Sequence, residues 1–158
     1  METQGASRAT TLENPAATAA LAAQLAELAR VGDVLALWGD LGMGKTAFAR
    51  AFIAARAGEA LVVPSPTFTL LQTYDLPNGP VWHFDLYRLA SPDDVWELGW
   101  EQGLSEAILL VEWPQRLGDF LPADRLDVSF AQGDGPEQRL MRLAASGAWE
   151  TRLDACHV

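Results

Sequence analysis

The sequence predicts an α/β domain of three layers, in which helices flank a central mixed, mainly parallel sheet that also carries antiparallel hairpins. Two short and almost entirely apolar runs, at 33–38 and 107–112, are typical of strands buried on both faces. Segments with helical patterns alternate with these strands, and this alternation favours parallel pairing. Asparagine followed by glycine at 78–79, between two further strand-like runs, indicates an antiparallel hairpin.

The beginning of the chain is predicted to lead into a long helix. The length of 158 residues fits one domain, which is expected to span residues 14–158. Residues 1–13 are small and polar and are expected to form a flexible segment. Asn14 and Pro15 have the residue types of a helix N-cap and a first helical position. A helix is therefore predicted from there to about Arg30, and the next glycine ends it.

A predicted strand and a second predicted helix enclose a glycine-rich turn. The apolar strand at 33–38 leads directly into this turn. Residues 46–57 are good helix formers, and Gly58 has the residue type that closes a helix.

The rest of the chain is predicted to contain two hairpins, a helix and a second buried strand. The runs at 68–74 and 81–87 flank the Asn-Gly turn and form the first hairpin. A helix is expected over 91–103, with serine as N-cap, proline and two aspartates in its first turn, and a closing glycine. The strand at 107–112 follows. The runs at 126–130 and 138–144 form a terminal hairpin around an Asp-Gly turn.

Charge and composition disfavour several classes of protein. The formal net charge of -10 at pH 7 repels polyphosphate, so this chain is not expected to bind nucleic acid by itself. No apolar run approaches the roughly 20 residues that span a bilayer, so no membrane attachment is expected. The only cysteine, Cys156, cannot form an internal disulfide. This agrees with a reducing compartment, and a cytoplasmic location is predicted.

The glycine-rich turn carries the most informative motif. Residues 39–46, GDLGMGKT, match the phosphate-binding pattern G-x-x-x-x-G-K-[ST] between a strand and a helix, which makes the predicted fold P-loop NTPase-like. The glycines allow successive backbone N–H groups to point at one anion, and the helix adds the positive end of its dipole. The residues expected to contact the nucleotide here are Gly39, Asp40, Leu41, Gly42, Met43, Gly44, Lys45, Thr46 and Ala47.

Lys45 is the only lysine in the chain, and every other basic residue is an arginine. A compact ammonium can reach the β- and γ-phosphates inside the loop, where a bulkier planar guanidinium would not fit. Lys45 is therefore a predicted catalytic residue. Thr46 offers a hydroxyl to Mg²⁺.

A magnesium site beside bound phosphates also needs a carboxylate, normally at the end of a strand adjacent to the strand of the loop. Asp85 and Glu112 each follow an apolar run. Sequence spacing alone does not decide which of them holds the metal. His83 alternates with Phe84 in the same predicted strand and is expected to be a half-buried packing residue.

Other classes of nucleotide-dependent protein fit less well. A GTPase would need a second lysine to read guanine, and the chain has none. The glycine-rich L-S-G-G signature of transporter ATPases is absent from the sequence. The arginines that a small-metabolite kinase would gather in a lid are scattered. Such a kinase remains the alternative, and a nucleotide-binding interaction module with incidental hydrolysis is a third possibility.

Four segments taken together resemble a known family. GDLGMGKT, SPTFTL at 65–70, HFDLYRL at 83–89 and VEWP at 111–114 are similar, in this order and spacing, to the ATPase family of bacterial tRNA threonylcarbamoyladenosine synthesis, TsaE, formerly YjeE. The resemblance covers roughly residues 14–145. Met43 and Ala22 stand where the family usually has alanine and glycine, and neither change removes a required polar group.

The resemblance implies an ATPase that binds ATP and Mg²⁺ and hydrolyses ATP slowly. It also implies two partners, the threonylcarbamoyl transferase TsaD and its companion TsaB, with tRNA contacted only indirectly through the complex. Carried over by motif, Thr46 and Glu112 would hold Mg²⁺ and Asp85 would support hydrolysis. Thr18 would lie near the nucleotide, and Arg139 would lie in a C-terminal strand that passes near the adenine. The segment 65–70 resembles a switch that senses the γ-phosphate, and Trp113 is either functional or a packing residue.

Overall fold

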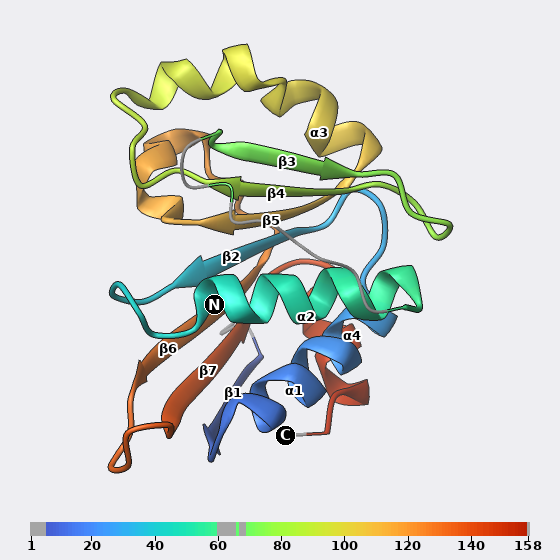
Figure 1. Ribbon diagram of the computed structural model, residues 1–158. Coiled ribbons are helices and arrows are strands. Elements are labelled where there is room, and N and C mark those ends of the chain that lie inside the picture. The colour runs from blue at the N-terminus through green and yellow to red at the C-terminus, as the bar shows by residue number, and fades with distance from the viewer. Residues whose placement is uncertain (1–5, 60–65, 67–68, 158) are drawn as a thin grey trace, which may run out of the picture.

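The computed structural model describes residues 6–59, 66 and 69–157. They form one central sheet between two layers of helical segments (Figure 1), which confirms the predicted fold class. The strands are β1 (Ser7–Leu12), β2 (Val34–Trp38), β3 (Leu71–Tyr74), β4 (Val81–Asp85), β5 (Ile108–Glu112), β6 (Leu126–Gln132) and β7 (Arg139–Ala145). The helices are α1 (Pro15–Leu28), α2 (Lys45–Ala57), α3 (Trp100–Glu106) and α4 (Trp149–Arg152), with 3-10 segments η1 (Pro92–Leu98), η2 (Pro114–Phe120) and η3 (Leu153–Ala155).

The strand order is β1-β7-β6-β2-β5-β4-β3. The four central strands β6, β2, β5 and β4 pair in parallel. Both predicted hairpins, β3–β4 and β6–β7, are antiparallel and lie toward the two edges of the sheet. This order places the ends of β4 and β5 on one side of the strand that leads into the glycine-rich turn.

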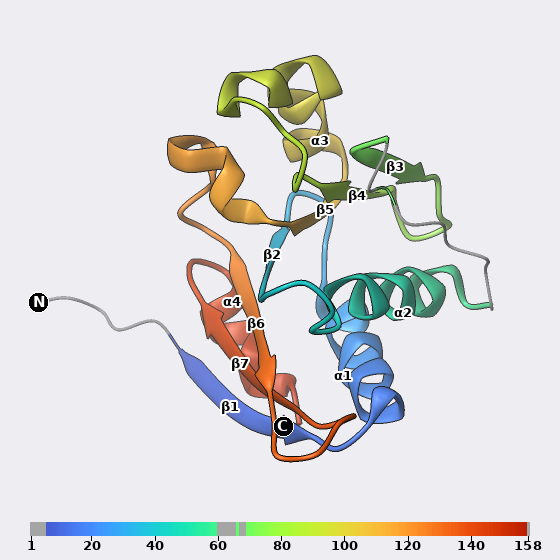
Figure 2. The ribbon, with the colours of Figure 1, turned by 60° about the vertical axis from the view of Figure 1, so that its left-hand side comes forward.

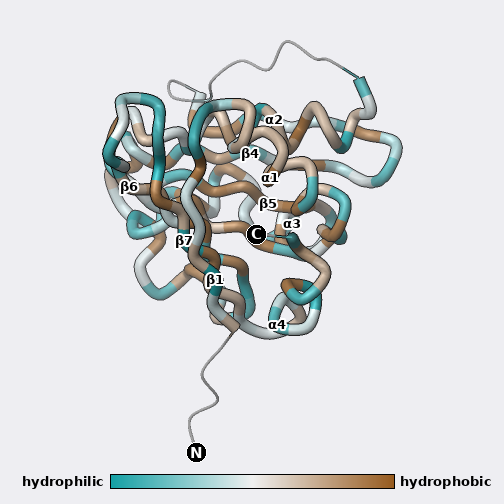
Figure 3. The backbone as a smooth tube through the Cα atoms, turned by 90° about the horizontal axis from the view of Figure 1, so that it is seen from below, coloured by the Kyte–Doolittle hydropathy of each residue, from teal (hydrophilic) through white to brown (hydrophobic). Residues whose placement is uncertain are grey.

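Two apolar cores lie on opposite faces of the sheet. In β5, Ile108 and Leu110 pack into the core under α1 and α2, whereas Leu109 and Val111 pack into the core under η1, α3 and η2. This alternation follows from the period of two in a strand. Since both faces are covered, β5 is buried along its whole length and appears as an apolar stretch at the centre of Figure 3.

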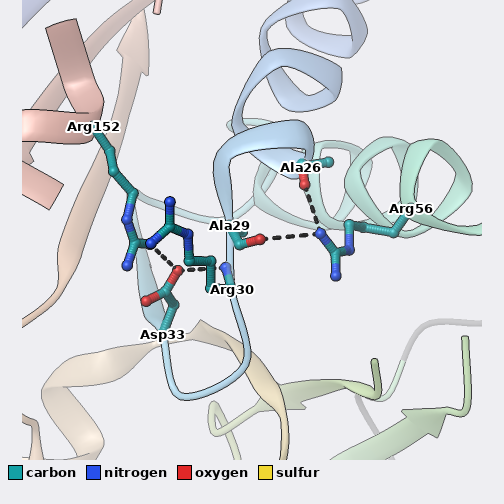
Figure 4. A network of polar contacts seen from close by, with 6 residues as sticks. All are labelled: Ala26, Ala29, Arg30, Asp33, Arg56 and Arg152. Atoms are coloured by element: carbon teal, nitrogen blue, oxygen red, sulfur yellow. Dashed lines mark hydrogen bonds and ion pairs between the residues drawn. The ribbon is translucent and has the colours of Figure 1, made fainter. Parts of the chain in front are cut away.

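Helix α1 begins as the sequence predicts and is fixed to α2 at its other end. The Asn14 side chain accepts a 3.0 Å hydrogen bond from the Ala17 N–H, and Pro15 is the first helical residue. At the end of α1, the Arg56 guanidinium donates to the carbonyls of Ala26 and Ala29 at 3.1 and 3.0 Å (Figure 4). One side chain of α2 thereby satisfies carbonyls that the helix end leaves without partners.

The predicted flexible segment at 1–13 is wrong for residues 7–12. These residues form β1, which pairs antiparallel with β7 in a register that joins Ser7 to Ala144 and Leu12 to Arg139. Figure 2 shows β1 along the edge of the sheet beside β7. Its partner is more than one hundred residues away in the chain, so the local composition of the segment did not indicate the pairing.

The helix predicted over 91–103 is divided in two. A 3-10 segment, η1, ends at Gly99, which has a positive φ of 84°, and α3 follows it to Glu106. Gly103 lies inside α3 and does not end the helix, which was its expected role. A Cβ atom at this position would lie 2.8 Å from the Trp82 ring, so glycine allows α3 to pack closely on the sheet.

The chain continues past the β6–β7 hairpin, which the sequence predicted to be terminal. Trp149 in α4 and Leu153 in η3 are buried in the core under α1 and α2. Arg152 forms an ion pair with Asp33, whose carboxylate also accepts a 2.7 Å hydrogen bond from the Arg30 N–H (Figure 4). Among the described residues, no helix combines the length and apolarity that a membrane crossing requires.

Candidate nucleotide and magnesium site

The glycine-rich turn joins the carboxyl end of β2 to the amino end of α2, as predicted. Gly39, Gly42 and Gly44 all have positive φ angles. Gly39 is the most constrained, because its φ is 143° and a Cβ atom there would lie 2.8 Å from the carbonyl oxygen of Phe130. Only glycine fits this position without moving the backbone of β6.

Helix α2 points its amino end at the loop. Gly44 is its N-cap and provides no side-chain hydrogen bond to the first turn. The helix has 13 residues, so its aligned peptide dipoles give the first turn a partial positive charge. An anion held by the loop would therefore meet backbone N–H groups and a favourable field.

Lys45 is buried in the loop, and its ammonium contacts three groups. Its Nζ donates to the carbonyl oxygen of Gly39 and, at 3.4 Å, to that of Asp40. Nζ also lies 3.6 Å from the centroid of the Trp113 ring. Burial lowers the pKa of Lys45 below its usual value, and the negative charge of Glu112 is the largest influence that opposes this shift.

Thr46 and Glu112, the two predicted metal ligands, are in direct contact. The Thr46 hydroxyl donates a 2.8 Å hydrogen bond to Oε1 of Glu112. Glu112 ends β5, which pairs in parallel with β2, and only 2% of the residue is exposed. The parallel sheet therefore brings a buried carboxylate to the first turn of α2.

Asp85, the predicted catalytic carboxylate, lies beside Glu112. The two residues are paired across β4 and β5 and end their strands together. An oxygen of Asp85 accepts a 3.1 Å hydrogen bond from the Tyr87 N–H. Asp85, Glu112, Lys45 and Thr46 line one cavity of about 290 Å³, together with Leu41, Gly42, Gly44, Ala47, Tyr87 and Trp113.

The expected role of His83 as a half-buried packing residue is wrong. The side chain is fully buried, and its Nε2 lies 2.7 Å from Oε2 of Glu112. One sequence signal placed His83 on the side of the site, although it did not identify Glu112 as the partner. His83 and Asp85 are two residues apart in a strand, so both face the same side of the sheet as the predicted site.

Thr18 and Arg139 lie on the other side of the loop. They line a second cavity of about 350 Å³ with Pro15, Gly42, Met43, Gly44, Ala47, Pro136 and Glu137. Arg139 donates to the carbonyl of Met43 at 3.2 Å and to that of Gly42 at 3.4 Å. The two cavities share Gly42 and Gly44 of the loop and Ala47 of α2, so this segment separates two adjoining spaces. Gly39 and Asp40, the two remaining predicted nucleotide contacts, line neither cavity, and the side chain of Asp40 is exposed.

Half of the predicted switch segment at 65–70, namely residues 65, 67 and 68, lies outside the described residues. At its end, Leu70 has a positive φ of 66°, and its carbonyl accepts a 3.0 Å hydrogen bond from the Asp85 N–H. Trp113 also has a positive φ, of 59°, and its ring lies 5.0 Å from that of Tyr87. Trp113 thus lines the cavity that contains Lys45, and Leu70 is joined through its carbonyl to Asp85, which lines the same cavity.

The polar groups around the cavity suit magnesium. The threonine hydroxyl and the two carboxylates provide only hard oxygen atoms, which are the ligands that Mg²⁺ prefers. Mg²⁺ is usually held by one or two carboxylates together with water and phosphate oxygens. Thr46 and Glu112 are thus sufficient as protein ligands for an ion that a nucleotide would share.

Comparisons with known proteins find relatives that match most of the chain. A family model described as "Threonylcarbamoyl adenosine biosynthesis protein TsaE" matches residues 12–141. The tRNA threonylcarbamoyladenosine biosynthesis protein TsaE of Rickettsia felis is 37% identical over 143 residues, which cover 90% of this chain and 83% of that protein. The protein of the same name from Bacillus subtilis is 36% identical over 138 residues, or 87% and 85% of the two chains.

A solved structure is also similar along nearly the whole chain. The crystal structure of YdiB from Bacillus subtilis has a TM-score of 0.78 and 30% sequence identity, and the match covers 97% of this chain and 95% of that one. The family match spans the loop, both carboxylates and Arg139. The chain therefore belongs to the TsaE family of threonylcarbamoyl adenosine biosynthesis proteins.

Proposed function

We propose that the chain is a magnesium-dependent ATPase subunit that serves threonylcarbamoyladenosine modification of tRNA. The observation that carries the proposal is the convergence of three side chains at the amino end of α2. Lys45 provides a cation, Thr46 a hydroxyl and Glu112 a buried carboxylate around one cavity. This set matches the chemistry that phosphoryl transfer from a nucleoside triphosphate needs.

Lys45 would exchange one set of contacts for another when ATP binds. Its ammonium now donates to two loop carbonyls, which are weaker partners than phosphate oxygens. The β- and γ-phosphates would take these hydrogen bonds, while the first turn of α2 contributes backbone N–H groups. Thr46 and Glu112 would hold Mg²⁺, which neutralises negative charge on the phosphates when bound.

Asp85 would orient the water that attacks the γ-phosphorus. It faces the same cavity as Lys45 and is held by the Tyr87 N–H. The attack breaks the bond between the γ-phosphorus and the bridging oxygen, so the products are ADP and inorganic phosphate. The adjoining cavity with Thr18 and Arg139 would take the sugar and base of ATP, because it borders the phosphate loop on the side opposite the Lys45 cavity.

The proposed role of this ATPase in tRNA modification rests on the names of its relatives. Their names assign them to tRNA threonylcarbamoyladenosine biosynthesis. A formal net charge of -10 disfavours direct contact with tRNA, so partners would hold the tRNA. The proposed partners are the transferase TsaD and its companion TsaB, and the γ-phosphate would set the balance between two states of the complex. Such a subunit would act in the cytoplasm.

ATP hydrolysis by the purified chain, alone and with TsaD and TsaB, tests the proposal. We expect weak hydrolysis alone, stimulation by the pair, and loss of both in Lys45→Ala. Hydrolysis that ignores the pair but rises stoichiometrically with a small alcohol or acid would instead indicate a metabolite kinase. If Lys45→Ala binds and hydrolyses ATP like the unaltered chain, the assignment of the site is wrong.

A further inference from the structure

His83 is a polar ring inside the apolar core beside the site. It lies on β4 two residues before Asp85, so its side chain points to the face of the sheet that α1 and α2 cover. Val81 and Leu110, its neighbours on this face, belong to the core under these helices. The ring has no exposed surface, and among the described residues its one hydrogen-bond neighbour is Oε2 of Glu112 at 2.7 Å. A polar group in such surroundings is costly unless its hydrogen bonds are used.

The position of the hydrogen between His83 and Glu112 follows from the other ring nitrogen. Nδ1 has no hydrogen-bond partner within the described part of the chain. A hydrogen on Nδ1 would be a buried donor without an acceptor, which is rarer in proteins than a buried acceptor without a donor. The hydrogen therefore belongs on Nε2. From there it is donated to the carboxylate of Glu112.

We propose that His83 is a positioning residue that fixes the Glu112 carboxylate for magnesium, an inference that rests on the proposed ATPase function. Rotation about the last bond of a glutamate side chain is soft, so one donor alone leaves the carboxylate free to turn. Thr46 holds Oε1 from α2, and His83 holds Oε2 from the neighbouring strand. With both oxygens engaged, the carboxylate has one orientation before the ion arrives. Partners of this kind typically change metal affinity by about 10- to 100-fold.

Two substitutions of similar polarity separate positioning from general packing. The amide nitrogen of glutamine can take the place of Nε2 and donate to Glu112. The amide of asparagine ends near the place of Nδ1 and cannot reach the carboxylate. His83→Gln should therefore preserve the effect that His83→Asn loses, although both place an amide in the same core.

Binding of Mn²⁺ in the presence of ATP, followed by electron paramagnetic resonance, compares the three proteins. We expect the affinity for Mn²⁺ to fall about tenfold or more in His83→Asn and by less than about threefold in His83→Gln. Affinity for ATP in EDTA should be the same in all three. If the unaltered chain binds no Mn²⁺ with ATP, the proposed function and this inference both fail. If it binds and the two variants equal each other, the inference alone fails.

The position of the hydrogen on Nε2 can be measured by NMR on the unaltered protein. This measurement requires neither a metal ion nor a folded His83→Asn variant. The chain has two histidines, His83 and the exposed His157, so a long-range ¹H–¹⁵N correlation spectrum shows the imidazole signals of these two residues alone. The signals that disappear in His83→Gln are those of His83. We expect His83 in the unaltered protein to show the pattern of a hydrogen on Nε2 at neutral pH. A pattern with the hydrogen on Nδ1 would overturn the inference.

Discussion

The Thr46 hydroxyl donates to Glu112 at 2.8 Å although 66 residues separate the two in the chain. Thr46 is in the first turn of α2, and Glu112 is the last residue of β5. β2 pairs in parallel with β5, and a short loop returns the chain from β2 to α2. The contact is therefore a product of the strand order, and it joins the two proposed magnesium ligands before any ion binds.

Thr46→Val tests the role of this hydroxyl. Valine has nearly the shape of threonine but provides no oxygen, so we expect the affinity for Mg²⁺ with ATP to fall at least about tenfold. The measurement is the Mg²⁺ concentration that gives half of the maximal rate of ATP hydrolysis. Thr46→Ser keeps the hydroxyl and serves as the control, with an expected change below about threefold. Equal Mg²⁺ requirements in the two variants would show that the hydroxyl is not a ligand.

The pH dependence of ATP binding tests the role of Lys45. Burial lowers the pKa of Lys45 below its usual value of 10.5, so the free protein loses this proton at a lower pH than an exposed lysine does. Phosphate oxygens bind the charged form. Affinity for ATP should therefore be highest below the lowered pKa and should fall as the pH rises through it, before 10.5 is reached.

Titration calorimetry with ATP at increasing alkaline pH measures this loss. Lys45→Met keeps an unbranched apolar stem in the loop but has no ammonium, so its weak residual binding should show no such decline. A decline of the same size in Lys45→Met would assign the pH effect to another group.

The sequence predicted the loop and the central strands because their signals are local. The pattern at 39–46 depends on backbone geometry over eight residues, and a strand buried on both faces is apolar throughout. The wrong predictions for residues 7–12 and for His83 concern contacts between distant segments, whereas the division of the helix predicted over 91–103 is a local effect of Gly99. β1 exists because β7 presents an edge for pairing, and Ser7–Leu12 has no pattern of its own that indicates this.

The same contrast between local signals and distant contacts explains why only part of the site was predicted. Asp85 and Glu112 were found because each ends an apolar run, whereas their pairing across β4 and β5 depends on the strand order. His83 was misjudged because histidine in a strand is usually a packing residue. Its contact with Glu112 needs the register of two strands that are joined by η1 and α3, and that register cannot be read from composition.

Gly39→Ala tests the fit of the loop against β6. The new Cβ would lie 2.8 Å from the Phe130 carbonyl at a φ of 143°, so either the loop or the strand must move. We expect a loss of about 2 to 4 kcal/mol in the free energy of unfolding, from overpacking together with backbone strain. ATP binding should be lost as well, because the shift displaces the carbonyl that now accepts from Lys45. Thermal and urea unfolding give the first quantity, and calorimetry gives the second.

Gly58→Ala is the matched control for this substitution. Gly58 also has a positive φ, of 74°, but a Cβ atom there would meet nothing within 4 Å. It closes α2 at the end opposite the phosphate loop. We expect a cost of about 1 kcal/mol from backbone strain alone and unchanged ATP affinity. If Gly39→Ala behaves like Gly58→Ala, the close approach to Phe130 does not constrain the loop.

The ion pair between Asp33 and Arg152 should stabilise the fold without affecting the site. The side chains are 10% and 15% exposed, respectively, and Asp33 also accepts the Arg30 N–H. Asp33→Asn would leave the Arg152 guanidinium without its charged partner, and we expect unfolding to become easier by about 1 to 3 kcal/mol. Asp33 precedes β2 at its amino end, whereas the phosphate loop follows its carboxyl end. ATP affinity should therefore stay unchanged.

Asp154→Asn is the control, because it removes an ion pair of the same kind from the surface. Asp154 pairs with Arg8 at 3.0 Å, and the two side chains are 74% and 41% exposed, respectively. Water and salt screen such a pair, so the expected cost is below about 1 kcal/mol. Urea unfolding of both variants at low and high salt separates the cases. The partly buried pair of Asp33 and Arg152 should keep most of its effect in high salt. A loss in Asp33→Asn as small as that in Asp154→Asn would show that Arg152 does not anchor the end of the chain through this carboxylate.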